Sequence, residues 1–149
     1  MASRDTTTGS SYEAIIEMCI KRSCKKNELE AISQATIGIK PGGGKHRVDW
    51  EIIDKRDPSK RGLVSCKYQG TSGTAEEKIA YEVIKLLYAM KTDARYKKSW
   101  IIMGGEGWSS SMREFINNHL TDWIPAMKNK VTILTTDQLI NTELNLMQN

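Results

Sequence analysis

The sequence predicts a three-layer α/β domain, in which helices cover both faces of a mixed β-sheet. The segments at 46–54 and 62–70 alternate apolar and polar residues, which is the period-two pattern of strands. The segment at 71–91 has the apolar spacing of a helix instead. Strand-like and helix-like segments then alternate, and a helical crossover between two strands makes them parallel. We therefore expect an early antiparallel hairpin, followed by parallel strands.

The N-terminal third is expected to contain a helix, a short strand and a glycine loop. Apolar residues recur at helical spacing over 11–23, after serines that can cap the helix. A polar stretch follows, and residues 35–40 can form a short strand. Proline and three consecutive glycines suit neither a helix nor a strand interior, so 40–45 should be a loop. The hairpin turn is expected at 55–62, where Asp-Pro and Gly favour a chain reversal.

The C-terminal half alternates strands and helices. Ser111 and Glu114 form a capping-box pattern at the start of one of these helices. Each helix is followed or preceded by a short apolar segment of the kind that forms a buried strand. Strands are expected at 98–105 and 131–136, and helices at 112–120 and 137–147.

Composition and length indicate one folded domain over residues 1–149. Hydrophobic residues make up 39% and charged residues 27%, which excludes a disordered chain. No apolar run approaches the roughly 20 residues that span a bilayer, and the N-terminus lacks the apolar core of a signal peptide. Three cysteines and two histidines show no zinc-like spacing, so we expect reduced thiols. The net charge of +4 is compatible with nucleic acid.

Asp49 and Lys67 lie on the two strands of the expected hairpin. On the second strand, Ser65, Lys67 and Gln69 share one face, because side chains two residues apart point the same way. A polar face on a central strand usually has a functional reason. Metal-assisted phosphodiester hydrolysis needs carboxylates for the ion and a cation near the phosphate, and this pair offers both groups. The alternative is an ordinary cross-strand Asp–Lys pair.

This arrangement resembles the PD-(D/E)xK nuclease superfamily, whose core of helix, hairpin, helix and strand matches residues 11–104. Asp49 matches the Asp of the motif and Lys67 matches its Lys. Ser65 stands at the position of the second acidic residue, and Val48 instead of proline precedes the Asp. The resemblance implies a restriction-endonuclease-like α/β/α core and metal-dependent hydrolysis of DNA.

The Ser-Cys-Lys sequence at 65–67 is similar to a variant in a subgroup of restriction enzymes, where the missing carboxylate comes from the following helix. At about 100° per residue, Glu76 lies roughly 20° from Val83 and inside the apolar face of that helix. Glu77 lies roughly 120° away, at the border of the face. Glu82, at about −100°, should make ordinary surface pairs. Glu76 is therefore the favoured catalytic metal ligand, with Glu77 as the second candidate.

Two further residues are candidates for the catalytic site. The segment from Gly9 to Glu13 resembles the Gly-x-x-x-Glu opening of the first helix in Holliday-junction resolvases, in which the Glu reaches the metal. Glu13 also lies opposite the most apolar side of its helix, so a solvated side chain is the alternative. The Gln69 amide can contact a DNA phosphate or a metal-bound water, or simply end the strand.

The residues expected to face DNA gather around the glycine loop. Its small residues allow basic side chains and backbone amides to approach phosphates. Trp108 lies in a later loop, where it can contact a sugar or base or pack in the core. The expected DNA-binding residues are Lys40, Lys45, His46, Arg47, Arg61, Ser65 and Trp108.

The resemblance implies an endonuclease that requires Mg²⁺, or Mn²⁺ in its place, and hydrolyses double-stranded DNA as a site-specific restriction or homing enzyme. A Holliday-junction or branched-DNA resolvase and an inactive nuclease-fold DNA-binding module are the alternatives. The small size leaves little beyond the catalytic core, so we expect a homodimer or higher homo-oligomer. We also expect a cytoplasmic protein of bacterial, archaeal or phage origin that does not bind membranes.

Overall fold

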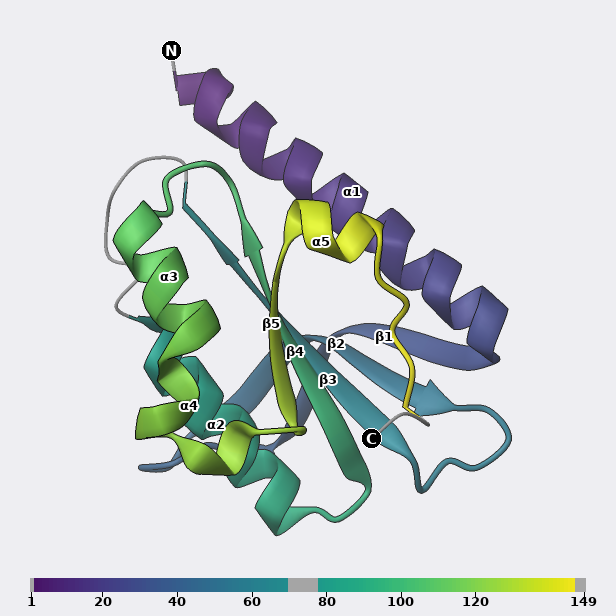
Figure 1. Cartoon of the computed structure of the whole chain (residues 1–149). Coiled ribbons are helices and arrows are strands. Elements are labelled where there is room, and N and C mark those ends of the chain that lie inside the picture. Colours follow the sequence, from purple (N-terminus) through teal and green to yellow (C-terminus); the bar gives the residue numbers. More distant parts are fainter. Residues whose placement is uncertain (1, 70–77, 147–149) are drawn as a thin grey trace.

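A five-stranded mixed sheet forms the centre of the domain (Figure 1). The computed structural model describes residues 2–69 and 78–146, with side chains from residue 11 onward. Strands follow one another across the sheet in sequence order. They are β1 (Leu29–Ile39), β2 (Lys45–Asp54), β3 (Arg61–Tyr68), β4 (Tyr96–Gly104) and β5 (Val131–Thr135).

Helices cover both faces of this sheet, which confirms the predicted three-layer α/β architecture (Figure 1). One apolar cluster joins the sheet to α1 (Ala2–Asn27) and α5 (Thr136–Ile140). The cluster on the other face is closed by α2 (Ile79–Thr92), α3 (Ser110–Asn118), α4 (Leu120–Trp123) and the short 3₁₀ helix η2 (Pro125–Met127). Among the described helices, none is long and apolar enough to cross a bilayer.

The strand directions also follow the prediction, with an antiparallel first part and a parallel second part. β1, β2 and β3 pair antiparallel, whereas β3, β4 and β5 pair parallel. The β2–β3 ladder runs from Ile53 opposite Arg61 to Trp50 opposite Val64. Beyond Val64, the ladder pairs of β3 in the described structure are all with β4. The two strands therefore separate into a fork, and this fork positions the site.

The first strand is much longer than the expected segment at 35–40. β1 begins at Leu29 and includes the polar stretch that the sequence did not assign to a strand. It lies at the edge of the sheet and pairs with β2 alone. An edge strand has little of its surface buried, so it needs few apolar residues and shows a weak periodic signal.

The helix ends differ from the prediction as well. Ser109, and not Ser111, caps α3, because its hydroxyl accepts from Met112 N. α5 is only five residues long and starts with a capping box between Thr135 and Gln138. Residues 141–146 lie beyond its end, and their buried leucines pack in the cluster with α1. The predicted helix at 137–147 is therefore wrong in length.

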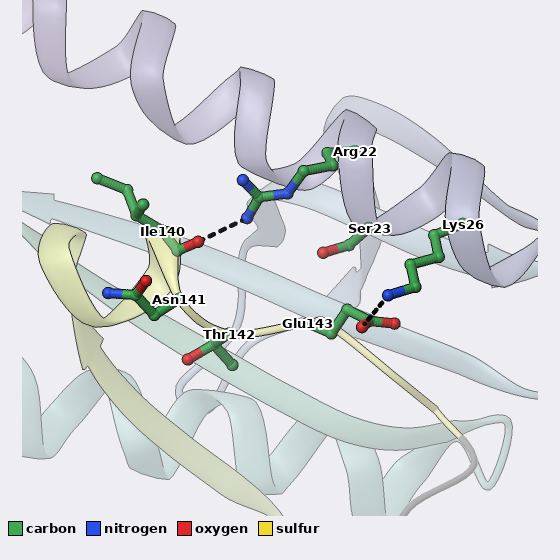
Figure 2. A pocket seen from close by; sticks show the side chains of 7 residues that line it. All are labelled: Arg22, Ser23, Lys26, Ile140, Asn141, Thr142 and Glu143. Atoms are coloured by element: carbon green, nitrogen blue, oxygen red, sulfur yellow. Dashed lines mark hydrogen bonds and ion pairs between the residues drawn. The ribbon is translucent and has the colours of Figure 1, made fainter.

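Hydrogen bonds and an ion pair join α1 to the end of α5 and to the segment that follows it (Figure 2). Arg22 donates to the Ile140 carbonyl at 2.9 Å, and Lys26 pairs with Glu143 at 2.9 Å. Ser23 Oγ accepts from Leu144 N at 3.1 Å. These bonds fix the axial position of α1, and Glu13 is carried on the same helix.

Candidate active site

The strand pair β1–β2 reverses its faces at Asp49. Val48 packs in the cluster below α2, yet Trp50, two residues later, packs against the cluster below α1. Opposite this point, Gln34 has a φ of 53°, a left-handed conformation that rotates the chain and breaks side-chain alternation. Asp49 lies at the rotation, where the fork between β2 and β3 opens. Its Oδ2 accepts a hydrogen bond from Cys66 N at 2.7 Å.

Asp49 lines a pocket of about 250 Å³ between the fork and α1. Glu13 and Glu17 line the same pocket, and none of its described lining residues is basic. Glu17 is paired with Lys21 at 2.9 Å. Among the described residues, Asp49 and Glu13 have no ion-pair partner, so two uncompensated carboxylates share one pocket.

The pKa values of Cys66 and Tyr68 are raised in this pocket. Burial raises the pKa of the Cys66 thiol to about 12, and the charge of Asp49 adds to the effect. Burial also raises the pKa of the Tyr68 hydroxyl, and the charge of Glu13 contributes. Both groups stay protonated at neutral pH, so Cys66 is not a nucleophile. The carboxylates of such a pocket favour a bound cation.

Lys67 points to the other side of β3, where it meets Glu82 of α2. Its Nζ lies 3.0 Å from Glu82 Oε1, and Lys85 Nζ lies 3.0 Å from the same oxygen. The Glu82 side chain is only 4% exposed. Burial alone would raise the pKa of this carboxyl, but Lys67 and Lys85 outweigh it and hold the pKa below its usual value. Glu82 is therefore an ionised acid between two lysines.

The expectation that Glu82 makes ordinary surface pairs is wrong. The buried side of α2 is set by Ile79, Val83 and Leu86, whereas the apolar Ile84 lies on the exposed side. The apolar residues of α2 extend beyond the side that packs against the sheet. The average direction of all its apolar residues therefore does not identify the buried side. Glu82 stands three residues after Ile79 and four before Leu86, and this spacing was the available signal.

The structure thus divides the expected catalytic residues between two sides of β3. Asp49 and Glu13 share the pocket below α1. Lys67 and the buried Ser65 lie on the side of α2. In the described part of the chain no ion pair joins Asp49 to Lys67, so the cross-strand pair considered as an alternative is absent.

His46 is buried and does not offer its ring to DNA. It is 2% exposed, and neither ring nitrogen has a hydrogen-bond partner among the described residues. Burial lowers the pKa of the imidazole from its usual 6.5, the charge of Glu82 opposes this, and Lys85 and Lys40 lower it further. Its expected role in DNA binding is corrected: the ring lies inside the domain because strand alternation turns it inward with Val48.

The buried histidine predicts how stability depends on pH. Below pH 6.5 the unfolded chain takes up a proton at His46 that the folded chain does not. The contribution of His46 is fully present above its unfolded pKa and is lost as pH falls toward its folded pKa, by up to about 1.4 kcal/mol per pH unit. Urea unfolding at about pH 7.5 and about pH 5.5 measures this loss. We expect His46→Met to reduce the loss, whereas the exposed His119→Gln should keep it; equal losses in all three proteins would contradict the assignment.

The basic residues at the β1–β2 loop and the start of β2 do lie on the surface. Lys40, Lys45 and Arg47 are exposed, and none has an ion-pair partner among the described residues. All three glycines of the loop have positive φ values, which glycine adopts without strain. Three exposed cations gathered at a tight loop and the strand that follows it suit contact with a phosphate backbone.

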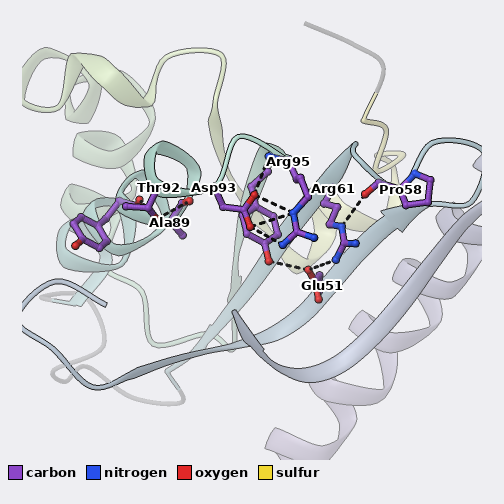
Figure 3. Close-up of polar contacts among 9 residues, drawn as sticks. Glu51, Pro58, Arg61, Ala89, Thr92, Asp93 and Arg95 are labelled. Atoms are coloured by element: carbon purple, nitrogen blue, oxygen red, sulfur yellow. Dashed lines mark hydrogen bonds and ion pairs between the residues drawn. The ribbon is translucent and has the colours of Figure 1, made fainter. Parts of the chain in front are cut away.

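Four other expected contacts are corrected by packing. Arg61 donates to the Pro58 carbonyl and pairs with the buried Glu51 at 3.2 Å, so its charge is used inside the domain (Figure 3). Trp108 is 4% exposed, and its Nε1 donates to the Gly104 carbonyl. The side chain of the buried Gln69 donates to the Gly107 carbonyl and ties the end of β3 to the next loop. Ser65 is buried too, and so is not exposed to DNA.

The favoured relocated carboxylates, Glu76 and Glu77, lie outside the described residues, so they stay predictions. Within the described ranges, no three side chains of His, Cys, Asp or Glu gather closely enough to hold a metal ion by themselves. Asp49 and the exposed Glu13 are the two carboxylate residues without an ion-pair partner among the described residues that line the pocket below α1. Mg²⁺ is commonly held by one or two carboxylates, with water and substrate phosphate completing its shell, so this donor set fits a hard divalent ion.

Comparison with known proteins identifies the family of the chain. No curated protein and no solved structure matched the chain. The sequence pattern of the PD-(D/E)XK nuclease superfamily domain matches residues 8–146, which include Glu13, the fork and α2. The chain therefore belongs to the PD-(D/E)XK nuclease superfamily.

Proposed function

We propose that this nuclease domain is a Mg²⁺-dependent endonuclease that hydrolyses phosphodiester bonds of DNA at the β2–β3 fork. The observation that carries the proposal is the Asp49 carboxylate, which Cys66 N holds in the fork at 2.7 Å, one residue before Lys67. Oδ2 takes this bond, and Oδ1 has no partner among the described residues. A carboxylate that is oriented by the backbone and has one free oxygen is prepared for a ligand.

Asp49 and Glu13 would hold the metal ion, which supplies positive charge against the phosphate. Glu17 is held by Lys21 and takes no part. The three exposed cations at the β1–β2 loop and the start of β2, Lys40, Lys45 and Arg47, would bind the DNA backbone on either side of the cut and fix its register. Each of these roles uses a group that has no ionic partner in the part of the chain that the structure describes.

Lys67 lies on the α2 side of β3, and from that side of the fork its ammonium would stabilise the charge that develops on the phosphate as the bond breaks. Glu82 is the positioning residue for this lysine, because its buried carboxylate fixes Lys67 Nζ at 3.0 Å. Lys85 shares the same carboxylate and keeps it ionised. We thus propose that the acidic residue of the second helix acts through Lys67.

A supercoiled plasmid tests the proposal directly. We expect nicking in the presence of Mg²⁺ or Mn²⁺ and none in excess chelator, because the two carboxylates bind substrate phosphate only through a cation. Restored nicking after Mg²⁺ is added back would exclude damage by the chelator. Undiminished nicking in chelator would remove the metal from the proposal.

A second candidate function is resolution of branched DNA. The observation that favours it is that Glu13 lines the same pocket as Asp49, as the Gly-x-x-x-Glu resemblance to junction resolvases implies. A matched linear duplex and a four-way junction of the same sequence distinguish the two functions by their cleavage rates. A homodimer would bring two such sites to two DNA strands. Sedimentation of the free protein measures its oligomeric state.

A further inference from the structure

A second pocket, of about 250 Å³, lies at the carboxyl ends of the parallel strands β4 and β5. Met103 comes from β4, Thr136 follows β5, and Tyr12 comes from α1. Crevices outside the carboxyl ends of parallel strands are where ligands commonly bind in α/β sheets. None of the roles proposed above uses this pocket.

Thr136, one of the residues that line this pocket, has a buried hydroxyl. The residue is 6% exposed, and Oγ1 has no hydrogen-bond partner among the described residues. A buried polar group without a partner costs free energy, which a ligand with a hydrogen-bonding group would recover. Trp108, which also lines the pocket, is held in place because its Nε1 donates to the Gly104 carbonyl at 2.8 Å.

The charged groups of the pocket disfavour the binding of a phosphate. Arg113 is its only cation among the described lining residues, whereas Glu106 and Asp137 supply two carboxylates. Arg113 Nε donates to the Trp108 carbonyl, and its other nitrogens have no partner in the described structure. Donors from Arg113, acceptors from the carboxylates and the hydroxyl of Thr136 match the edge of a nucleobase, which carries both kinds of group. The apolar Met103 and the ring of Tyr12 suit its flat faces.

This pocket adjoins the Asp49 pocket. Tyr12 and Glu13 are consecutive on α1, and one lines each pocket. A side chain at Gly104 would meet the Tyr68 ring at 2.8 Å and Thr136 Oγ1 at 3.7 Å, so the two groups flank the same glycine. Tyr68 lines the Asp49 pocket. A strand with its phosphate at Asp49 therefore has a neighbouring nucleotide within reach of Thr136.

We infer that this second pocket binds an unpaired nucleobase of the DNA strand whose phosphate lies at Asp49. The inference rests on the proposed function for its DNA substrate. A base stacked and paired in a duplex cannot enter a recessed pocket without leaving the helix, which costs a few kcal/mol. The domain should therefore prefer DNA that already has an unpaired base beside the cut, such as a bulge or a branch.

Nucleoside binding tests the pocket independently of cleavage. Methyl NMR signals of Thr136 and Met103 are followed in the full chain with 2′-deoxyguanosine, with 2′-deoxycytidine and with inorganic phosphate, each added separately. We expect at least one nucleoside to shift both signals and phosphate to shift neither. Shifts with phosphate alone would identify an anion site and overturn the inference, as would no shift with either nucleoside.

DNA binding in chelator tests the preference for an unpaired base. Fluorescence anisotropy compares a matched duplex with the same duplex carrying a one-nucleotide bulge. We expect the wild-type chain to bind the bulged DNA at least about fivefold more tightly, and Thr136→Val to lose this preference with the loss of one hydrogen bond. The exposed Thr132→Val on β5 is the matched control and should keep it.

Stability separates a binding role of Thr136 from a structural one. Because its hydroxyl has no partner among the described residues, Thr136→Val should unfold at the same urea concentration as the wild type or a higher one. Equal affinity for the two duplexes would overturn the inference and leave the nuclease function intact. Nucleoside shifts in a chain that binds neither duplex would support the pocket and overturn the DNA nuclease proposal.

Discussion

Asp49→Asn is expected to reduce the rate of DNA cleavage by on the order of a hundredfold or more, because it removes one of the two uncompensated carboxylates of the pocket. The fold should persist, since the amide oxygen of Asn can still accept the hydrogen bond from Cys66 N. The free energy of unfolding should then change by less than about 1 kcal/mol. Plasmid nicking under single-turnover conditions and urea unfolding measure the two quantities.

The matched control for this variant is Glu30→Gln, which removes a carboxylate from the exposed part of β1, outside both pockets. It should cleave at the wild-type rate. Wild-type cleavage by Asp49→Asn would contradict the site, whereas loss of cleavage together with loss of folding would assign Asp49 a structural role only. A second variant, Asp49→Ala, then distinguishes these roles, because it also removes the acceptor of the Cys66 hydrogen bond.

Glu82→Gln is expected to produce the largest combined effect on stability and rate. The change leaves Lys67 and Lys85 beside a buried neutral amide, and breaking a buried ion pair on one side is strongly destabilising. Because both lysines are partly exposed and can turn toward water, we expect a loss of about 2–4 kcal/mol. Cleavage by the folded fraction should also fall, since Lys67 loses the carboxylate that orients it.

A double-mutant cycle separates these two effects. In a Lys67→Met background, Glu82→Gln should cost little further cleavage rate, because there is no ammonium left to position. Glu114→Gln, an exposed carboxylate of α3, is the control for charge and should change neither quantity. If Glu82→Gln lowers the cleavage rate equally with and without Lys67, its action does not pass through the lysine.

The layer architecture and strand directions could be predicted because they depend on long periodic segments. The α2 helix and the β2–β3 hairpin each carry enough apolar residues to show their period. β1 could not be found in the same way, because it is an edge strand with most of its residues exposed or half-buried. Periodicity reports burial, and a strand that is scarcely buried leaves little trace of it.

The site was predicted less completely because two of its features are set by tertiary structure. The face reversal at Asp49 depends on the left-handed conformation of Gln34 in the neighbouring strand, which alternation within β2 cannot reveal. The buried Glu82 carboxylate pairs with Lys85 of its own helix and with Lys67 of β3, and the second of these partners cannot be read from the helix alone. The identities of Asp49 and Lys67 followed from a motif, whereas their surroundings did not.

The bonds that join α1 to the end of α5 and the segment after it also affect the order in which the domain folds during synthesis. The bond from Leu144 N to Ser23 Oγ joins residues 121 positions apart. A ribosome releases the N-terminus first, so the helix that carries Glu13 waits for almost the entire chain before these bonds can form. The fork between β2 and β3 joins residues far closer in sequence and can assemble earlier. Nascent chains should therefore hold Asp49 in place before Glu13, and the nuclease pocket should close only at the end of translation.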